Sequence, residues 1–204
     1  MSNGTLYIIS APSGAGKSSL LDAALKEIDG AQLSISHTTR PPRPGEEDGV
    51  QYNFTTIEDF KSGVEKDQFL EYAEVFDNYY GTSELWVDDT LSGGVDVILE
   101  IDWQGARLVR KKIAESVTIF ILPPSQPALK ERLKGRGQDS DEVIARRLQD
   151  AMSDMAHYDE YDYLIINDDF EQAKEELKTL FLATRLQQKR QAENHQELLV
   201  SLLN

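Results

Sequence analysis

An eight-residue run near the N-terminus, residues 11–18, has the residue types and spacing of a loop that binds phosphate groups. It reads A-P-S-G-A-G-K-S and matches the pattern G-x-x-x-x-G-K-[ST] at every fixed position except the first, which is Ala11. The glycines would let successive backbone N–H groups face phosphate oxygens, Lys17 would reach the terminal phosphates, and the Ser18 hydroxyl would bind Mg²⁺. The candidate phosphate-binding residues are Ala11, Pro12, Ser13, Gly14, Ala15, Gly16, Lys17 and Ser18.

The segments on either side of this loop favour a binding site over a flexible glycine-rich turn that binds nothing. Residues 5–10 are apolar and β-branched, as in a short strand, and residues 19–28 carry apolar side chains at helical spacing. A helix that begins after the loop would direct the partial positive charge of its N-terminus toward the anion. Alanine fits the first position of the loop if the backbone there does not need a positive φ.

Basic residues gather in two further places along the chain. Arg40 and Arg43 lie three residues apart in a proline-rich turn, which would let both guanidinium groups converge on one phosphate with little loss of loop entropy. Tyr52 and Tyr80 could add hydroxyl donors. The second group flanks a glycine-interrupted segment, and its candidate phosphate ligands are Arg132, Arg136 and Arg147. The competing interpretation in both places is a solvated basic surface.

The composition limits the classes of function. The chain has 204 residues and a formal net charge of −15, which argues against binding a nucleic acid polymer because such binding needs a basic face. It contains no cysteine, so disulfides and thiolate metal sites are excluded, and its three histidines have no metal-ligand spacing. No apolar run approaches the length of a membrane span. We therefore expect a cytoplasmic protein that binds small phosphorylated ligands and no membrane.

Apolar runs of strand length alternate with helical segments over most of the chain, which predicts a parallel sheet with helices on both faces and ligands at the carboxyl edge of its strands. The expected strands are 6–10, 33–36, 95–101, 117–122 and 163–166, and the expected helices are 17–28, 104–113, 126–133, 141–158 and 170 to about 199. The interval 38–89 breaks this alternation and predicts a small α+β insertion. The charged segment 134–141 has few apolar side chains and is expected to be mobile.

Several blocks of sequence together resemble the guanylate kinase family over nearly the whole chain. Besides the phosphate loop they are the run at 36–46, N-Y-Y-G-T at 78–82, I-D-W-Q-G at 101–105, R-L-K-G-R-G at 132–137 and N-D-D at 167–169. The resemblance implies a P-loop NTPase-type α/β fold and an enzyme that transfers the γ-phosphoryl group of ATP to GMP with Mg²⁺. It also implies a core of residues 1–36 and 90–204, a mobile lid at about 126–150, and a GMP-binding subdomain at 37–89.

The resemblance implies how GMP would be bound. The residues implied at its phosphate are Arg40, Arg43, Tyr52 and Tyr80. The residues implied around its base are Ser36, Glu71, Gly81, Thr82 and Glu100. Guanine presents two adjacent donors, N1–H and the 2-amino group, so a carboxylate such as Glu71 suits it. Glu100 stands where the family more often has aspartate, and its extra methylene moves the acceptor by about one C–C bond, which could alter affinity for the base.

The resemblance also implies how ATP would be bound. The residues implied to be catalytic at its phosphates are Lys17, Arg132, Arg136 and Arg147, of which the three arginines belong to the lid. Arg136 and Asn167 are implied as further contacts of the nucleotide. Asp102, two residues after Glu100, points to the same side of the strand by its period of two and would approach Mg²⁺ through water, close to the acceptor.

Two other functions and one question of assembly stay open at this stage. A P-loop kinase of a ribosyl phosphate compound would share the core and the lid, but it would not need the base-reading block at 36–82. A non-catalytic guanylate-kinase-like module that binds peptides would usually have a degraded phosphate loop, whereas Lys17 and Ser18 are intact here. The C-terminal segment 187–204 contains four leucines that could pack on the chain's own core or on a neighbouring subunit in a homo-oligomer.

Overall fold

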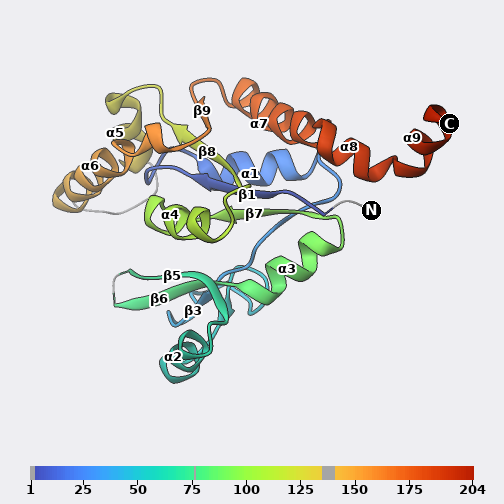
Figure 1. The fold of residues 1–204 in the computed structure, drawn as a ribbon. Coiled ribbons are helices and arrows are strands. Elements are labelled where there is room, and N and C mark those ends of the chain that lie inside the picture. Colours follow the sequence, from blue (N-terminus) through green and yellow to red (C-terminus); the bar gives the residue numbers. More distant parts are fainter. Residues whose placement is uncertain (1–2, 76, 135–140) are drawn as a thin grey trace.

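The computed structural model describes residues 3–75, 77–134 and 141–204. Within these residues the strands form a five-stranded sheet in the order β2-β7-β1-β8-β9 and a four-stranded sheet in the order β4-β3-β6-β5 (Figure 1). Every pairing in the five-stranded sheet is parallel, so the predicted parallel α/β fold is confirmed. No helix in the described ranges is both long and apolar enough to cross a membrane.

The central strand of the larger sheet is β1, Leu6–Ser10, which is buried along its whole length. One side of β1 pairs with β7, Asp96–Glu100, and β7 pairs in turn with β2, Ala31–Leu33. The other side pairs with β8, Val117–Leu122, which is followed by the edge strand β9, Tyr163–Ile166. Near-continuous apolar runs are what strands covered on both faces require, which is why the mainly buried strands β1, β7 and β8 are readable from the sequence.

Helices cover both faces of this sheet (Figure 1). The helices α1, Lys17–Leu25, and α7, Phe170–Arg185, enclose one apolar core with every second side chain of β1. The helices α3, Glu84–Ser92, and α4, Trp103–Lys112, enclose a second core with the alternate side chains of β1. The sheet is thereby fixed from both sides, and its carboxyl edge has a defined geometry for a site.

Two further helices, α5 (Gln126–Lys134) and α6 (Asp141–Met155), pack on each other through a separate small apolar cluster. The helix expected at 141–158 is shorter in the structure, because α6 ends at Met155. A 3₁₀ turn at Tyr158–Glu160 then leads to β9. The helix expected from 170 to about 199 is broken, because α7 is followed by α8, Gln188–Asn194, and α9, Gln196–Leu203. These last two helices project from the body on the same side as the N-terminus (Figure 1).

The insertion forms the second sheet, below the core in Figure 1. Its strands are β3 (His37–Thr38), β4 (Asn53–Phe54), β5 (Phe69–Val75) and β6 (Asn78–Ser83). The helix α2, Ile57–Glu65, begins at Thr56, whose side chain accepts a hydrogen bond from the Asp59 backbone N–H and so caps the helix. The buried ring of Phe60 stacks on Phe69 and fixes α2 against this sheet. The α+β character predicted for this interval is thus present.

Candidate functional site

The predicted phosphate loop connects the end of β1 to the start of α1, with Lys17 as the first residue of the helix. Gly14 and Gly16 have φ of 88° and 92°, in the region that residues with a Cβ rarely adopt. Space is also short at Gly16, since a Cβ there would lie 2.6 Å from Nδ2 of Asn167. Among the described residues, the only non-glycine positions with positive φ are Asp67 and Asp77, so alanine fits position 11 without strain.

Side chains from distant parts of the chain hold this loop in shape. Asn167, which is buried after β9, donates from Nδ2 to the carbonyl oxygen of Ala15 at 2.7 Å. Arg132 on α5 donates to the same oxygen at 3.2 Å and to the Asn167 carbonyl at 2.8 Å. Arg147 on α6 donates to the Ser13 hydroxyl at 3.1 Å. The structure therefore brings Asn167 and two of the three predicted lid arginines together on the phosphate loop.

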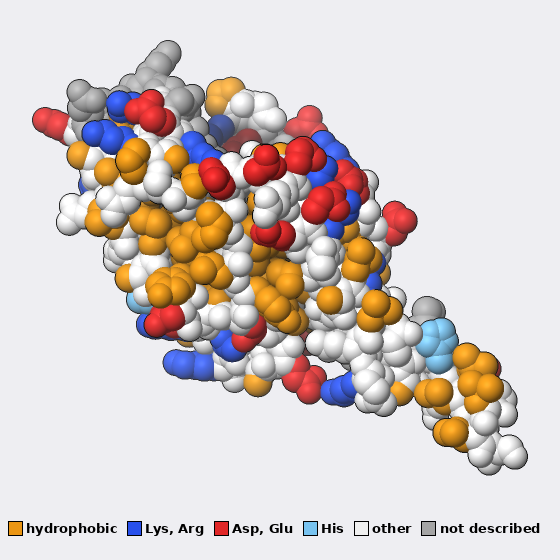
Figure 2. Space-filling view, turned by 90° about the horizontal axis from the view of Figure 1, so that it is seen from above, with side chains coloured by type: hydrophobic (Ala, Val, Ile, Leu, Met, Phe, Trp, Pro, Cys, Tyr) orange, Lys and Arg blue, Asp and Glu red, His pale blue; other side chains and the backbone are white. Residues whose placement is uncertain are grey.

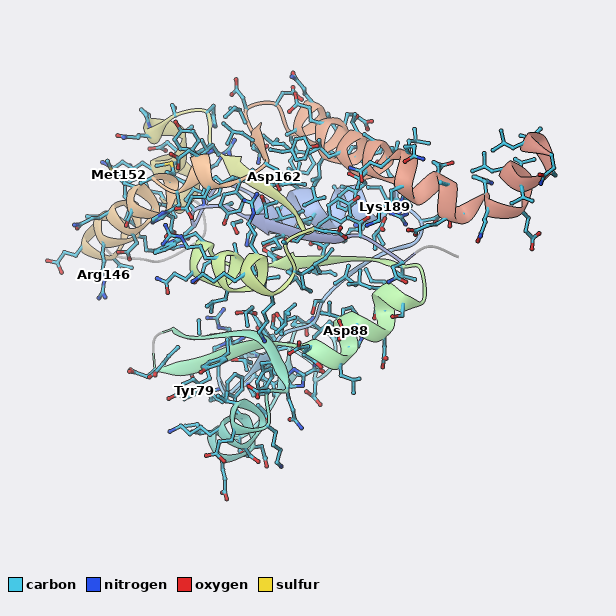
Figure 3. The ribbon with its side chains drawn as sticks, in the orientation of Figure 1. Tyr79, Asp88, Arg146, Met152, Asp162 and Lys189 are labelled. Carbon is cyan, nitrogen blue, oxygen red and sulfur yellow. The ribbon has the colours of Figure 1, made fainter. Side chains whose placement is uncertain are left out.

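The third predicted arginine, Arg136, lies outside the described residues, as does most of the segment expected to be mobile. Arg146, next to Arg147 in the sequence, is exposed and lies on the outer side of α6 (Figure 3). The two neighbouring arginines of α6 therefore have different surroundings, and Arg147 is the one beside the loop.

Glu100 lies against the phosphate loop, because parallel pairing puts it opposite Ile9 where β7 and β1 end. The Ser18 hydroxyl donates to its carboxylate at 2.5 Å, and Nζ of Lys17 lies 3.6 Å from the same oxygen. Burial lowers the pKa of Lys17, and the charge of Glu100 opposes this shift. The Lys17 side chain keeps 17% of its surface exposed, so it is available to a ligand from the solvent side.

A second cluster of polar groups lies where β5 and β6 of the insertion face α4. Glu71 is 6% exposed, and the Thr82 hydroxyl donates to its Oε1 at 2.6 Å. Burial raises the pKa of Glu71 to about 7, the hydrogen bond from Thr82 opposes the rise, and the charge of Asp102 adds to it. Asp102 accepts from the Gly105 backbone N–H at 2.8 Å and so caps α4. The structure therefore places Glu71, Thr82 and Asp102 together.

Gly105 lies close to both of these carboxylates, so a side chain at this position would crowd them. A Cβ on it would lie 3.2 Å from Oε2 of Glu71 and 3.4 Å from Oδ1 of Asp102. Gly81 is tight for a different reason, since a Cβ there would lie 3.0 Å from the rings of Phe60 and Phe69. Ser36 joins the same sheet through its carbonyl oxygen, which accepts from the Asn53 backbone N–H at 2.9 Å.

The proline-rich turn brings together Arg40, Tyr52 and Tyr80. The Arg40 guanidinium lies 5.3 Å from the centre of the Tyr52 ring, and the two tyrosine rings are 5.9 Å apart. Burial raises the pKa of Tyr52, the neighbouring Tyr80 adds to the rise, and the charge of Arg40 opposes it. Arg43 is exposed at the outer side of the turn.

Glu46 is a residue of this cluster that the sequence reasoning did not single out. Its carboxylate accepts two hydrogen bonds from NH2 of Arg40, at 2.8 and 2.9 Å, and one from the Arg43 backbone N–H at 2.7 Å. These contacts with Arg40 lower the pKa of Glu46. Another NH group of Arg40 donates to the Pro41 carbonyl, so the guanidinium is fixed in orientation. The available signal was the spacing of Glu46, three residues after Arg43 and six after Arg40.

No cluster of three or more histidine or carboxylate side chains that could hold a metal ion occurs in the part of the chain that the structure describes. The Ser18 hydroxyl and the Glu100 carboxylate are, however, adjacent oxygen donors beside the loop. Oxygen donors of this kind suit Mg²⁺, which commonly takes one or two protein ligands and completes its shell with phosphate oxygens and water. The residues present therefore fit an ion that arrives with a nucleotide.

The fold and this site define a P-loop nucleotide-binding protein of the α/β class, with a second carboxylate-lined site on an inserted subdomain. The family model described as guanylate kinase matches residues 3–184. The chain is 63% identical to a guanylate kinase of Hahella chejuensis, with 91% of this chain and 89% of that protein covered. It is 55% identical to the guanylate kinase of Escherichia coli K12, with 100% and 99% covered.

A solved structure agrees with these sequence comparisons. The crystal structure of guanylate kinase from Anaplasma phagocytophilum superposes with a TM-score of 0.75 at 31% sequence identity, and the match covers 93% of this chain and 90% of that one. The chain belongs to the guanylate kinase family.

Proposed function

We propose that this protein transfers the γ-phosphoryl group of ATP to GMP, giving ADP and GDP, and that the phosphate loop and the Glu71 cluster bind the donor and the acceptor. The observation that carries this proposal is the pairing of two unlike sites, one formed by a loop and cations and the other by buried carboxylates. The first suits phosphates of any nucleotide, while the second suits a base with adjacent hydrogen-bond donors.

On the donor side, the backbone N–H groups of the loop and Lys17 bind the β- and γ-phosphates of ATP. Arg132 and Arg147 already contact the loop, so a small movement of α5 and α6 brings their guanidinium groups to the same phosphates. Mg²⁺, when bound with ATP, neutralises charge on the phosphate oxygens. Phosphoryl transfer needs mainly alignment and positive charge, which is what these residues supply.

Glu100 belongs to the donor side in this proposal. Its carboxylate lies on Ser18 and Lys17, so it holds the hydroxyl and the ammonium in place before nucleotide binds. With ATP present, it is placed to accept hydrogen bonds from water in the Mg²⁺ shell. Asp102 lies beside Glu71. In this proposal Asp102 therefore contributes to guanine binding and does not approach the metal.

On the acceptor side, Arg40, Arg43, Tyr52 and Tyr80 bind the phosphate of GMP. Glu46 and the Pro41 carbonyl accept hydrogen bonds from the Arg40 guanidinium. In this proposal they fix its orientation, and its remaining N–H groups donate to that phosphate. Ionised Glu71 accepts from N1–H and from the 2-amino group of guanine. Adenine presents an acceptor at the first position and no amino group at the second, so it would leave the buried carboxylate unsatisfied.

The test is the rate of ADP formation from ATP with GMP, AMP, CMP and UMP as acceptors, measured in a coupled assay. GMP is expected to be preferred strongly, because a site that loses its hydrogen bonds to a buried charged group discriminates well. Preference for another monophosphate would overturn the proposal. Failure to bind ATP in the presence of Mg²⁺ would favour the non-catalytic binding module, whose usual mark is a degraded phosphate loop.

A further inference from the structure

The helices α5 and α6 form one end of the molecule, opposite to the C-terminal helices α8 and α9 (Figure 1, Figure 2). They pack on each other through an apolar cluster of their own, which is separate from the two cores that cover the sheet. In its first half α6 carries Arg147, which contacts the phosphate loop at Ser13. Because a helix moves as a rigid rod, the way its other end is held affects where Arg147 lies.

An aromatic stack holds that other end of α6. The ring of Trp103, the first residue of α4, stacks on the ring of His157, with 3.7 Å between the ring centres and 21° between the ring planes. The Arg107 guanidinium, one helical turn further along α4, lies 4.6 Å from the centre of the Trp103 ring. His157 follows the last residue of α6, Met155, by two positions. The end of α6 is therefore in contact with the first turn of α4 through side chains of defined orientation.

Glu160 holds both partners of Trp103 in place. Its carboxylate accepts hydrogen bonds from Nε and Nη2 of Arg107 at 2.6 and 2.5 Å, and Nδ1 of His157 lies 2.7 Å from the same carboxylate. The hydrogen bonds from Arg107, assisted by His157, lower the pKa of Glu160 to about 2, so this group is ionised near neutral pH. We call Trp103, Arg107, His157 and Glu160 the tryptophan cluster.

Asp154 gives Trp103 a second connection to α6. It lies seven residues, or about two helical turns, after Arg147, so the two side chains project from the same face of α6. Its backbone carbonyl accepts from the His157 N–H at 3.2 Å. Burial raises the pKa of Asp154, the hydrogen bond from the Trp103 side chain opposes the rise, and the charge of Asp102 adds to it. Trp103 is thus hydrogen-bonded to α6 as well as stacked on the residue that follows it.

Trp103 is joined to the acceptor side through its neighbour in the chain. Asp102, directly before it, caps α4 by accepting from the Gly105 backbone N–H at 2.8 Å. Gly105 in turn lies close to both Asp102 and Glu71. A displacement of Trp103 therefore displaces Asp102 as well, because both belong to the first turn of one helix.

We propose that Trp103 is a positioning residue that transmits a movement of α6 to Asp102, so that each of the two nucleotides strengthens the binding of the other. This inference rests on the proposed function. A movement of α6 that carries Arg147 to the donor phosphates also moves His157, and the stack passes the displacement to the first turn of α4. Packed side chains carry coupling between sites in this way, and the coupling free energy is the same in both directions. Without the stack, α6 would move over ATP with no change at Asp102.

Calorimetric titration measures this coupling without turnover. GMP is titrated into the protein alone, and into the protein saturated with Mg²⁺ and an ATP analogue that cannot transfer its γ-phosphate. In the wild type the Kd for GMP should fall by about fivefold or more when the analogue is present, as is typical of coupled sites. In Trp103→Leu the two Kd values should become nearly equal, while the Kd for GMP alone changes little. His157→Leu removes the other ring of the stack and should give the same result, which keeps the test valid if Trp103→Leu does not fold.

Tyr158→Leu is the matched control, because it removes an exposed aromatic ring next to His157. It should keep the wild-type ratio of Kd values. A wild-type ratio in Trp103→Leu or His157→Leu, with or without a lower unfolding temperature, would show a merely structural role and overturn the proposal. Equal Kd values in the wild type would overturn it too. A wild type that binds no GMP under either condition would overturn the proposed function and this inference together, so the two failures are distinguishable.

Fluorescence tests whether binding of the donor nucleotide reaches Trp103. The chain has two tryptophans, so Trp86→Phe leaves Trp103 as the sole one. Adding Mg²⁺ and the ATP analogue to this variant is expected to change the emission of Trp103, because the imidazole and the carboxylate beside its ring move with α6. Adding His157→Leu should remove most of this change. Emission that stays constant in Trp86→Phe as the analogue saturates the protein would overturn the proposal.

Discussion

The two halves of the candidate site are built from different chemistry. On the donor side, backbone groups define the phosphate loop, and Asn167 and Arg132 hold it through the carbonyl oxygen of Ala15. On the acceptor side, the site is formed by buried or paired carboxylates: Glu71, which we propose binds the base, and Glu46, which pairs with Arg40. A loop of N–H groups and cations recognises phosphate whatever base is attached, whereas a buried carboxylate depends on the donors that the base presents. Turnover should therefore depend on the donor half, and selectivity on the acceptor half.

The largest expected effect is at Lys17. In Lys17→Ala, kcat should fall by roughly a hundred- to a thousandfold with every acceptor, since a preorganised charge at the transferring group is lost. Steady-state kinetics and circular dichroism on the same sample would separate loss of catalysis from loss of fold. Lys26→Ala, an exposed lysine at the end of the same helix, is the matched control. A kcat within tenfold of wild type would contradict the assignment of Lys17 to the donor phosphates.

Glu71→Gln should lower kcat/KM for GMP by about ten- to a hundredfold, as expected for replacing hydrogen bonds to a charged acceptor worth about 1.5–3 kcal/mol. Because the loss concerns the guanine donors, the rate with AMP should change much less, and the selectivity ratio should collapse. The control is Glu74→Gln, an exposed glutamate of the same strand. An equal loss with GMP and AMP would place Glu71 outside base recognition.

The raised pKa of Glu71 predicts a pH dependence of GMP binding. Guanine needs the ionised carboxylate, and burial holds the pKa at about 7, so the ionised fraction falls as the pH drops through 7. The KM for GMP should rise about tenfold for each pH unit well below that value. Glu71→Gln should lack this component, which distinguishes it from titration of the GMP phosphate itself. Identical pH profiles of KM for the two proteins would contradict the role of Glu71.

Glu46→Gln should raise the KM for GMP severalfold with little change in kcat. The amide cannot hold the Arg40 guanidinium with two charge-assisted hydrogen bonds, so the arginine loses its fixed orientation toward the acceptor phosphate. Glu47→Gln, at the neighbouring exposed position, should leave both constants unchanged. A fall in KM would mean that Glu46 competes with the phosphate instead of positioning Arg40.

The smallest expected effect is that of Glu100→Asp, which tests whether Glu100 acts on the donor side or on the acceptor side. The shorter side chain of Glu100→Asp cannot reach Ser18 and Lys17 from the same backbone position, so affinity for Mg²⁺ with ATP should change by a small factor. Calorimetric titration of the protein with ATP, at several Mg²⁺ concentrations, measures this change without turnover. The KM for GMP should stay at the wild-type value. A change in that KM alone would contradict this assignment and would indicate that Glu100 binds the base of GMP.

Local sequence signals predicted the parts of the molecule that depend on neighbours in the chain. The phosphate loop and the apolar runs of β1, β7 and β8 follow from spacing and burial, so the parallel sheet was readable from the sequence. The surroundings of Glu100 were not, because its contact with Ser18, 82 positions away in the sequence, depends on the pairing of β7 with β1. The ion pair of Glu46 with Arg40 depends on the backbone conformation of the proline-rich turn between them. The proline content of that turn does not by itself specify this conformation. The break after α7 lies between Arg185 and Arg190, both of which bind Asp96, a buried aspartate far away in the sequence.

The central claim is that the donor phosphates and the acceptor base bind at these two unlike halves. A crystal structure with GMP and an ATP analogue that cannot transfer its γ-phosphate tests it most directly. We predict the γ-phosphate beside Lys17, the GMP phosphate beside Arg40, and N1 and the 2-amino group of guanine within hydrogen-bond distance of the Glu71 carboxylate. Guanine bound away from Glu71, or GMP bound in the phosphate loop, would contradict the account.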